Sequence, residues 1–294
     1  APTNLVATAT GQTTISLTSN AVQNATSYKV YNGETVVVSG LTVTSYTVEG
    51  LTAGTEYCYK VTAVNEVGES EASTEACATT EFPPIVVETI TVNGVSFNMI
   101  QVEGGTFTMG SVYNPYDGIT DYADEEPAHS VTLTTYSIGE TEVTQELWKA
   151  VMGSDSPASW GEYMKKDDYY PQRPAEFMSW GDCQTFISKL NELTGKNFRL
   201  PTEAEWEFAA RGGNESQSFR FAGSDIADSV SWGLSNAGFR KHTVGLKKPN
   251  ELGLYDMTGN VSEWCSDWYA PYYLGTEPNP KGPIIGSEKI VRGG

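Results

Sequence analysis

The sequence predicts a multidomain protein in which an all-β sandwich precedes a larger α+β domain. The composition changes near residue 81, because residues 1–80 contain no Trp, Phe or Met, whereas all 7 Trp lie further along the chain. The first part shows short strand patterns separated by turn residues, which is typical of a sandwich. The second part contains three helix patterns, each with its own cap. A length of 294 residues accommodates two or three domains.

The strand patterns of residues 1–80 are short and rich in Thr, Val, Ser and Ala. They cover Thr14–Leu17, Ser27–Tyr31, Glu34–Val38, Ser45–Val48, Tyr57–Val64 and Ala72–Thr79. Asn32-Gly33, Gly50 and Gly54 supply turn signals between them. Glu81-Phe82-Pro83-Pro84 then predicts a stiff linker, because two prolines forbid helix and favour extended chain.

Three stretches of this first part carry a family resemblance: Ala1-Pro2-Thr3-Asn4-Leu5, Ala25–Tyr31 and Gly50–Tyr57. On these residues the segment resembles a fibronectin type III domain, an immunoglobulin-like sandwich. The resemblance implies that Tyr57 forms the corner of that family, in which a tyrosine hydroxyl ties the chain to upstream backbone. It also implies a departure, since Ser19 stands where members carry a core Trp. Either neighbouring side chains fill the space or the register differs.

The second part begins with strand patterns at Ile90–Val95, Gly105–Met109 and His129–Leu133. Three helices follow, and each opens with a residue that caps helix N-termini well. Thr144 precedes Gln145–Met152, Ser179 precedes Trp180–Leu193, and Thr202 forms a capping box with Glu205 at the start of a helix to Ala210. Beyond Arg211 the sequence predicts irregular loops and short strands.

Many short motifs of this second part occur in the same order in one enzyme family. They are Gly104–Gly110, Glu142–Gln145, Ser179-Trp180, Arg199–Glu207, Ala209–Gly213, Gly253–Val261, Asp267–Tyr269 and Val291–Gly294. On these motifs residues 97–294 resemble the formylglycine-generating-enzyme family, also called the sulfatase-modifying-factor domain. The resemblance implies a C-type-lectin-like α+β fold. We therefore predict a fibronectin type III domain over 1–80, a linker and leading strand over 81–96, and a C-terminally incomplete formylglycine-generating-enzyme-like domain over 97–294.

The oxidase activity of that family depends on a cysteine pair that binds copper and activates oxygen, shortly after its Arg-Gly-Gly motif. Here the motif is Arg292-Gly293-Gly294, where the sequence stops. A cuprous site needs two adjacent thiolates, but Cys183 falls on the apolar stripe of its helix and Cys265 follows Trp264. We therefore expect no copper and no catalytic residue in this chain. Formylglycine-generating activity is the alternative if a cysteine pair follows Gly294.

The resemblance also implies a calcium site in the loop Asp256–Glu263. Its ligands would be the carboxylates of Asp256 and Glu263 and the main-chain oxygens of Gly259 and Val261. Hard oxygen donors at i, i+3, i+5 and i+7 on a glycine-containing turn suit Ca²⁺. The alternative is that both carboxylates only accept hydrogen bonds within turns.

The chain has 4 cysteines, Cys58, Cys77, Cys183 and Cys265, and no zinc-type cluster of Cys and His. We expect the disulfides Cys58–Cys77 and Cys183–Cys265, because each pair lies within one predicted domain and disulfides suit an exported protein. The alternative is four buried free thiols.

Charge narrows the choice of partners. There are 18 Lys and Arg against 37 Asp and Glu, a formal net charge of −19. This balance argues against nucleic acid and against an anionic membrane surface as partners. The chain starts at Ala1 without a signal peptide, so we expect a mature exported protein at the cell surface or in the periplasm, with any lipid anchor or membrane attachment outside this chain.

The predicted function is therefore binding or adhesion to a protein or carbohydrate ligand by a non-catalytic, lectin-like scaffold. A structural subunit of an envelope complex is a further alternative. Tyr269, Tyr272 and Tyr273 are the aromatic side chains expected to contact a ligand, since aromatics give large contact areas. Packing within a loop is the other interpretation of these tyrosines.

Overall fold

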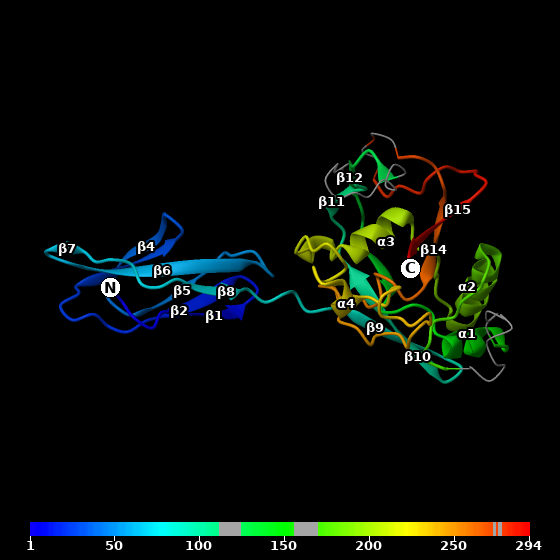
Figure 1. The fold of residues 1–294 in the computed structure, drawn as a ribbon, viewed down its shortest axis with the longest axis horizontal. Coiled ribbons are helices and arrows are strands. Elements are labelled where there is room, and N and C mark those ends of the chain that lie inside the picture. The colour runs from blue at the N-terminus through cyan, green and yellow to red at the C-terminus, as the bar shows by residue number, and fades with distance from the viewer. Residues whose placement is uncertain (112–124, 156–169, 273–274, 276–277) are drawn as a thin grey trace. The chain divides into compact units, whose positions relative to one another are not determined.

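The computed structural model describes residues 1–111, 125–155, 170–272, 275 and 278–294. Its contacts divide the chain into two units, Ala1–Pro84 and Ile85–Gly294, each with its own buried core (Figure 1). In the described ranges no helix combines the length and the apolar composition that crossing a membrane requires.

The first unit is a sandwich of two antiparallel sheets. One sheet has the order β1-β2-β5, formed by β1 (Val6–Gly11), β2 (Thr14–Thr18) and β5 (Ser45–Val48). The other has the order β4-β3-β6-β7, formed by β4 (Thr35–Leu41), β3 (Ser27–Asn32), β6 (Glu56–Asn65) and β7 (Gly68–Glu69), and β8 (Ala76–Thr79) also pairs with β6. Alternate residues such as Ile15, Leu17, Val30 and Val61 face inward and build the core.

The structure settles two expectations for this sandwich. The Tyr57 hydroxyl accepts a hydrogen bond from Thr52 N–H at 3.0 Å, so the tyrosine corner is confirmed. Ser19 lies half-buried beside Leu17 and Tyr28, at a hollow of only about 10 Å³. Neighbouring side chains therefore fill the space that a tryptophan would occupy.

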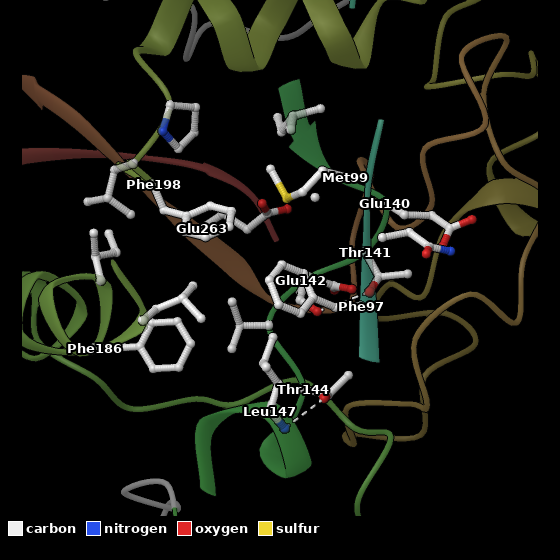
Figure 2. Close-up of a pocket in the computed structure, with 18 of the residues that line it drawn as sticks. Phe97, Met99, Glu140, Thr141, Glu142, Thr144, Leu147, Phe186, Phe198 and Glu263 are labelled. Atoms are coloured by element: carbon white, nitrogen blue, oxygen red, sulfur yellow. Dashed lines mark hydrogen bonds between the residues drawn. The ribbon is translucent and has the colours of Figure 1, made fainter. Parts of the chain in front are cut away.

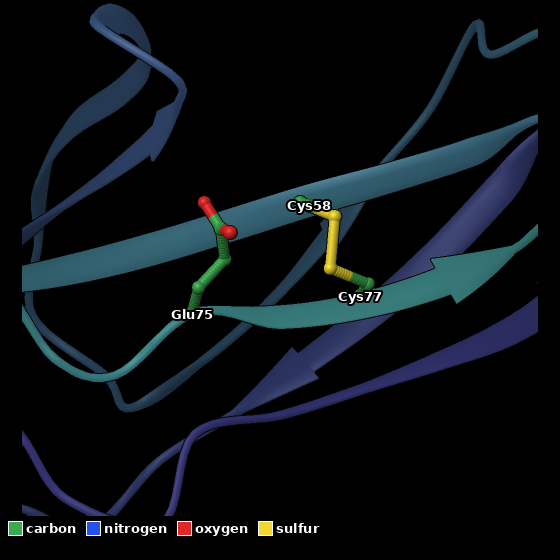
Figure 3. Close-up of side chains that lie close together, drawn as sticks. All are labelled: Cys58, Glu75 and Cys77. Atoms are coloured by element: carbon green, nitrogen blue, oxygen red, sulfur yellow. A yellow bond between two sulfur atoms is a disulfide. The ribbon is translucent and has the colours of Figure 1, made fainter.

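A disulfide joins β6 and β8. Cys58 and Cys77 are directly opposite each other in the antiparallel register, and their sulfurs are bonded (Figure 3). The predicted first disulfide is thus present in the structure.

The second unit is built on a three-stranded antiparallel sheet of order β13-β10-β9, from β9 (Val87–Val92), β10 (Val95–Val102) and β13 (Tyr136–Gly139). The predicted single strand over 90–95 is wrong, because Asn93-Gly94 forms the turn of the β9–β10 hairpin. Both residues have positive φ, 49° and 84°, as a tight hairpin of this kind requires. The described residues also form two separate two-stranded antiparallel sheets. One pairs β11 (Thr106–Met109) with β12 (His129–Thr132), and the other pairs β14 (Ser262–Trp268) with β15 (Lys289–Gly293).

Three helices begin at the predicted caps. They are α1 (Gln145–Met152), α2 (Trp180–Thr194) and α3 (Glu203–Ala210), and two short turns follow, η2 (Gly213–Glu215) and α4 (Ala227–Val230). Thr202 and Glu205 form the expected capping box of α3. The Trp148 ring of α1 stacks on Phe186 of α2 with the ring centroids 5.2 Å apart. This pair belongs to a hydrophobic core that also contains Val92 of β9. Helix α3 packs into a separate core that contains Phe208 and Cys265.

The expected Cys183–Cys265 disulfide is wrong, because both cysteines are free thiols. Cys265 points from β14 into the α3 core. Cys183 lies on α2 and lines a groove together with Phe186 and Ile187. The two side chains therefore face different surroundings even though their segments touch, as the hydrogen bond from Trp180 Nε1 to Cys265 O at 3.0 Å shows.

Candidate functional site

Asp256 lies at the centre of the most unusual polar cluster of the second unit. It sits in the loop before β14 with a left-handed φ of 55° and is 2% exposed. Its Oδ2 accepts a hydrogen bond from Gly245 N–H at 2.7 Å, whereas its Oδ1 is buried and meets no N–H donor, and the carboxyl group lies in hydrogen-bond range of the Glu142 side chain. Burial raises the pKa of this carboxyl above its usual value. A buried carboxylate oxygen without a partner is costly, and either a proton shared with Glu142 or a bound cation would offset that cost.

Glu142 is a second member of this cluster, and the sequence motifs did not predict it as a site residue. It follows β13, and its Oε1 accepts a hydrogen bond from Asn260 Nδ2 at 3.0 Å while Oε2 is buried without a partner. Burial, followed by the negative charges of Glu263 and Asp256, raises the pKa of Glu142 well above its usual range. The only sequence signal was its place in the motif Glu142–Gln145.

Glu263, at the start of β14, is the third carboxylate. Trp206 Nε1 donates a hydrogen bond to its Oε2 at 3.3 Å. Burial, with a further contribution from the charge of Asp256, raises the pKa of Glu263 to about 7. In the described ranges none of the three carboxylates forms an ion pair with Lys or Arg.

The predicted main-chain ligands lie in the same region. A Cβ atom placed on Gly293 would be 3.3 Å from Val261 O and 3.5 Å from Glu263 Oε1, so these two oxygens face one point. Gly259 has a φ of 87°, and a Cβ there would be 2.4 Å from Trp232 O, which leaves room for glycine only. The two oxygens are donors of the kind that suits a hard cation such as Ca²⁺, although a ring carbon of Trp206 also lies 3.5 Å from this point.

A groove leads to these carboxylates. Its volume is about 970 Å³, and it lies between β10, β13, α1, α2 and β14. Figure 2 shows Glu142 and Glu263 on its wall, among apolar side chains that include Phe97, Met99 and Phe198. Glu142 and Glu263 therefore face this groove, whereas Asp256 lies behind its lining.

A different trio is excluded as a metal site. Among the described residues, the possible ligand atoms of Cys58, Glu75 and Cys77 all lie within 4.8 Å of one another (Figure 3). Both sulfurs are consumed by the disulfide, and Glu75 pairs with Lys60 at 3.4 Å. The oxygens of Glu142, Asp256 and Glu263 do not meet the same distance limit, so a bound ion would also need main-chain oxygens.

A second buried group of carboxylates surrounds Arg292 of β15. Its Nη1 is 2.7 Å from Glu125 Oε1 and its Nη2 is 2.7 Å from Glu207 Oε2, while Glu203 Oε1 is 3.6 Å from Nη1. Arg211 adds a second cation at Glu207, at 2.7 Å. Burial raises the pKa of Glu203 to about 7 against the opposing charge of Arg292. These groups compensate one another and leave no vacant ligand position among the described residues.

Of the tyrosines predicted to contact a ligand, the two that the structure describes differ in their exposure. Tyr269 is 41% exposed. Tyr272 packs its ring edge-on against His129 and buries its hydroxyl, which favours the packing interpretation for this residue. Tyr273 lies outside the described residues.

Neither free thiol has the properties of a redox centre. Burial raises the pKa of Cys183 to about 11, and it also raises the pKa of Cys265 well above its usual value. Reactive thiolates need lowered pKa values and access to solvent. Burial therefore keeps both described thiols in their protonated form near neutral pH.

Comparison with known proteins agrees with this architecture. Residues 87–294 match the sulfatase-modifying factor enzyme 1-like domain, and residues 1–79 match the fibronectin type III domain. The chain is 32% identical to the chaperone protein LppX of Paenibacillus barcinonensis, over 60% of this chain and 73% of that protein. It is 29% identical to the formylglycine-generating enzyme of Streptomyces coelicolor, over 66% of this chain and 77% of that protein.

Two solved structures share the fold of the second unit. One is the Treponema denticola variable protein 1, with 33% identity and a TM-score of 0.62 over 72% of this chain and 88% of the other. The second is PvdO from Pseudomonas aeruginosa, with 27% identity and a TM-score of 0.55 over 72% of this chain and 86% of the other. The chain therefore belongs to the sulfatase-modifying factor enzyme 1-like family, with a fibronectin type III domain ahead of its C-type-lectin-like α+β domain.

Proposed function

We propose that this protein is an exported polypeptide-binding protein that uses its family domain as a calcium-stabilised scaffold, without oxidase chemistry. The observation that carries the proposal is the group of three buried carboxylates, Glu142, Asp256 and Glu263, that no Lys or Arg of the described chain neutralises. A cation bound there would act on stability, while the two free thiols are unsuited to oxygen activation.

Calcium would be held by Asp256, Glu263 and the main-chain oxygens of Gly259 and Val261, with Glu142 as an additional carboxylate. The ion would supply positive charge that satisfies the unpaired oxygens. Because these residues come from the segment after β13, from the loop before β14 and from the start of β14, the same ion would tie two distant parts of the domain together.

Two observations support export and a polypeptide ligand. The Cys58–Cys77 disulfide suits an oxidising compartment. One relative is named a chaperone protein, a class that acts on polypeptides. A carbohydrate ligand is less well supported, since Tyr272 is packed inward and leaves Tyr269 as the exposed ring of that pair.

The stabilising ion can be tested by thermal unfolding of the full chain. Addition of 1 mM CaCl₂ to EGTA-treated protein should raise the Tm of the second unit, because an ion that binds only the folded state adds about 2.7 kcal/mol at 100 times its Kd. Glu263→Gln should lose this response. Glu140→Gln is the matched control, since Glu140 accepts a hydrogen bond from Asn98 outside the cluster. An equal calcium response in wild type and Glu263→Gln would refute the site.

The second candidate function is formylglycine generation, which the identity to the Streptomyces enzyme favours. The assay incubates the protein with a thiol-bearing sulfatase peptide, Cu(I) and oxygen and measures aldehyde by hydrazide labelling. We expect no aldehyde above the level without protein. Aldehyde that disappears in the Cys183→Ser or Cys265→Ser variant would replace the binding proposal with the oxidase.

A further inference from the structure

Two phenylalanines on the surface of the second unit adopt a backbone conformation that bulky residues rarely take. Phe177 has a φ of 60° and is 68% exposed, and Phe239 has a φ of 58° and is 90% exposed. The left-handed region suits Gly and Asn, and a bulky side chain there is an outlier. Neither side chain is buried in a core, so packing within the domain does not account for phenylalanine at these positions.

The segments that carry Phe177 and Phe239 are fastened to each other. Glu176 and Lys241 form an ion pair with side chains that are only 18% and 12% exposed. Val244 N–H also donates to Gln172 O at 2.9 Å. These ties involve neighbours of the phenylalanines and not the rings themselves, so they restrain the backbone beside each ring and leave both rings exposed.

The second segment is also anchored to the carboxylate cluster beneath it. Asn260 Oδ1 accepts a hydrogen bond from His242 N–H at 2.8 Å, and Asp256 Oδ2 accepts one from Gly245 N–H at 2.7 Å. The exposed loop is therefore fixed by residues of the proposed scaffold. A rigid support of this kind lowers the entropy cost of binding.

Each segment also contributes an arginine without a carboxylate partner. Arg240 follows Phe239 directly and is exposed. Arg173 lies with its guanidinium 3.8 Å from the centre of the Tyr170 ring, an arrangement that leaves the guanidinium edge free for a carboxylate. Neither arginine forms an ion pair within the described ranges. We call Arg173, Phe177, Phe239 and Arg240 the phenylalanine surface.

We propose that the phenylalanine surface binds a polypeptide segment in which apolar side chains alternate with Asp or Glu. The rings would contact the apolar side chains, and the two guanidinium groups would pair with the carboxylates. This inference rests on the proposed polypeptide-binding function and names the surface and the class of ligand. A lipid bilayer fits less well, because two arginines are few contacts for the many anionic headgroups of a membrane surface, whereas two carboxylates of a peptide suffice to pair with them.

The test uses the full chain and a defined probe, a fluorescent synthetic peptide that alternates Phe or Leu with Glu. Fluorescence anisotropy should show saturable binding to wild type. The double variant Phe177→Asn/Phe239→Asn should bind at least about 10-fold more weakly, as expected when anchor rings are lost. Its Tm should stay the same or rise by roughly 2–4 °C, because Asn tolerates the left-handed backbone better than Phe.

Three controls sharpen this experiment. Ile284→Asn removes an equally exposed apolar side chain (Ile284 is 96% exposed) and should leave binding unchanged. A peptide with Lys in place of Glu should not bind. Arg173→Gln/Arg240→Gln should weaken binding and reduce its dependence on salt.

Several outcomes would overturn the proposal. They are equal binding by wild type and the double asparagine variant, equal binding of the Lys peptide, binding of phosphatidylglycerol vesicles that requires the two rings, and self-association in sedimentation that requires them. Failure of this proposal would leave the calcium response and the aldehyde assay unaffected, so it can be told apart from failure of the proposed function.

Discussion

The second unit buries two groups of carboxylates that differ in how their charge is compensated. Around Arg292, the carboxylates of Glu125 and Glu207 each lie 2.7 Å from a guanidinium nitrogen. Around Asp256, no Lys or Arg of the described ranges forms an ion pair with a carboxylate, and the charge of His242 only partly opposes the rise in the pKa of Asp256. The same fold thus neutralises one acidic cluster with its own guanidinium groups, whereas the other forms no ion pair with Lys or Arg in the described ranges.

The distances within the Arg292 group show how local this compensation is. Glu203 lies 3.6 Å from the guanidinium, and burial still raises its pKa to about 7. A charge that is not in direct contact therefore only partly offsets the loss of solvent. By the same argument, a cation near Asp256 must contact the oxygens directly to compensate them.

The largest expected effect is the removal of the internal cation. Arg292→Met should destabilise the second unit by about 3–5 kcal/mol, because it leaves the buried carboxylate of Glu207 short of a partner. Urea unfolding measures the change. Lys196→Met is the matched control, since its contact with Glu88 is also short, 2.6 Å, but exposed, and it should cost less than about 1 kcal/mol. Equal losses in the two variants would show that Arg292 is not buried as described.

The sequence allowed much of this architecture to be predicted. The helix starts at Thr144, Ser179 and Thr202 follow from local capping chemistry, and the structure has all three caps. The tyrosine corner at Tyr57 likewise depends on a short stretch of chain. Features set by neighbouring residues can be recognised from a sequence because tertiary packing changes them little.

The features that the sequence did not predict depend on contacts between distant segments. Glu142 joins Asp256 and Glu263 only after folding brings together residues more than a hundred positions apart. The Cys183–Cys265 pair was expected from a shared domain, yet the two side chains face different environments on α2 and β14. The calcium ligands Asp256, Gly259, Val261 and Glu263 stay a prediction. They were chosen from the residue types and spacing of a single loop.

The next effect concerns Glu203 and its dependence on pH. The pKa of Glu203 is raised from 4.5 to about 7 in the folded state. Protonated Glu203 therefore contributes its full share to the free energy of unfolding below pH 4.5, and this contribution is lost as the pH rises through 7. The groups that face it are Arg292, Tyr272, Glu207 and Asp267. Glu203→Gln should match wild type near pH 4.5 and be more stable at pH 8, by roughly 3 kcal/mol at most.

Urea unfolding of both proteins from pH 4.5 to pH 8 gives the comparison for Glu203. Only the difference between the two curves is informative, because other buried carboxyls titrate in both proteins. A constant difference across this range would mean that Glu203 keeps the same protonation in the folded and unfolded states.

The smallest expected effect tests the uncompensated cluster without its ion. In EGTA at pH 8, Glu142→Gln/Glu263→Gln should be more stable than wild type by about 1 kcal/mol, a rise in Tm of roughly 2–4 °C, since it removes two carboxyl groups whose ionised form is disfavoured by burial and by neighbouring negative charge. In calcium the order should reverse, because only wild type gains the ion. The corresponding neutralisation in the other group, Glu207→Gln, should destabilise the protein in both buffers, since Arg292 and Arg211 would lose their shared partner. A double variant that is less stable than wild type in EGTA would mean that Glu142 and Glu263 are already compensated within the chain, and the contrast between the two clusters would disappear.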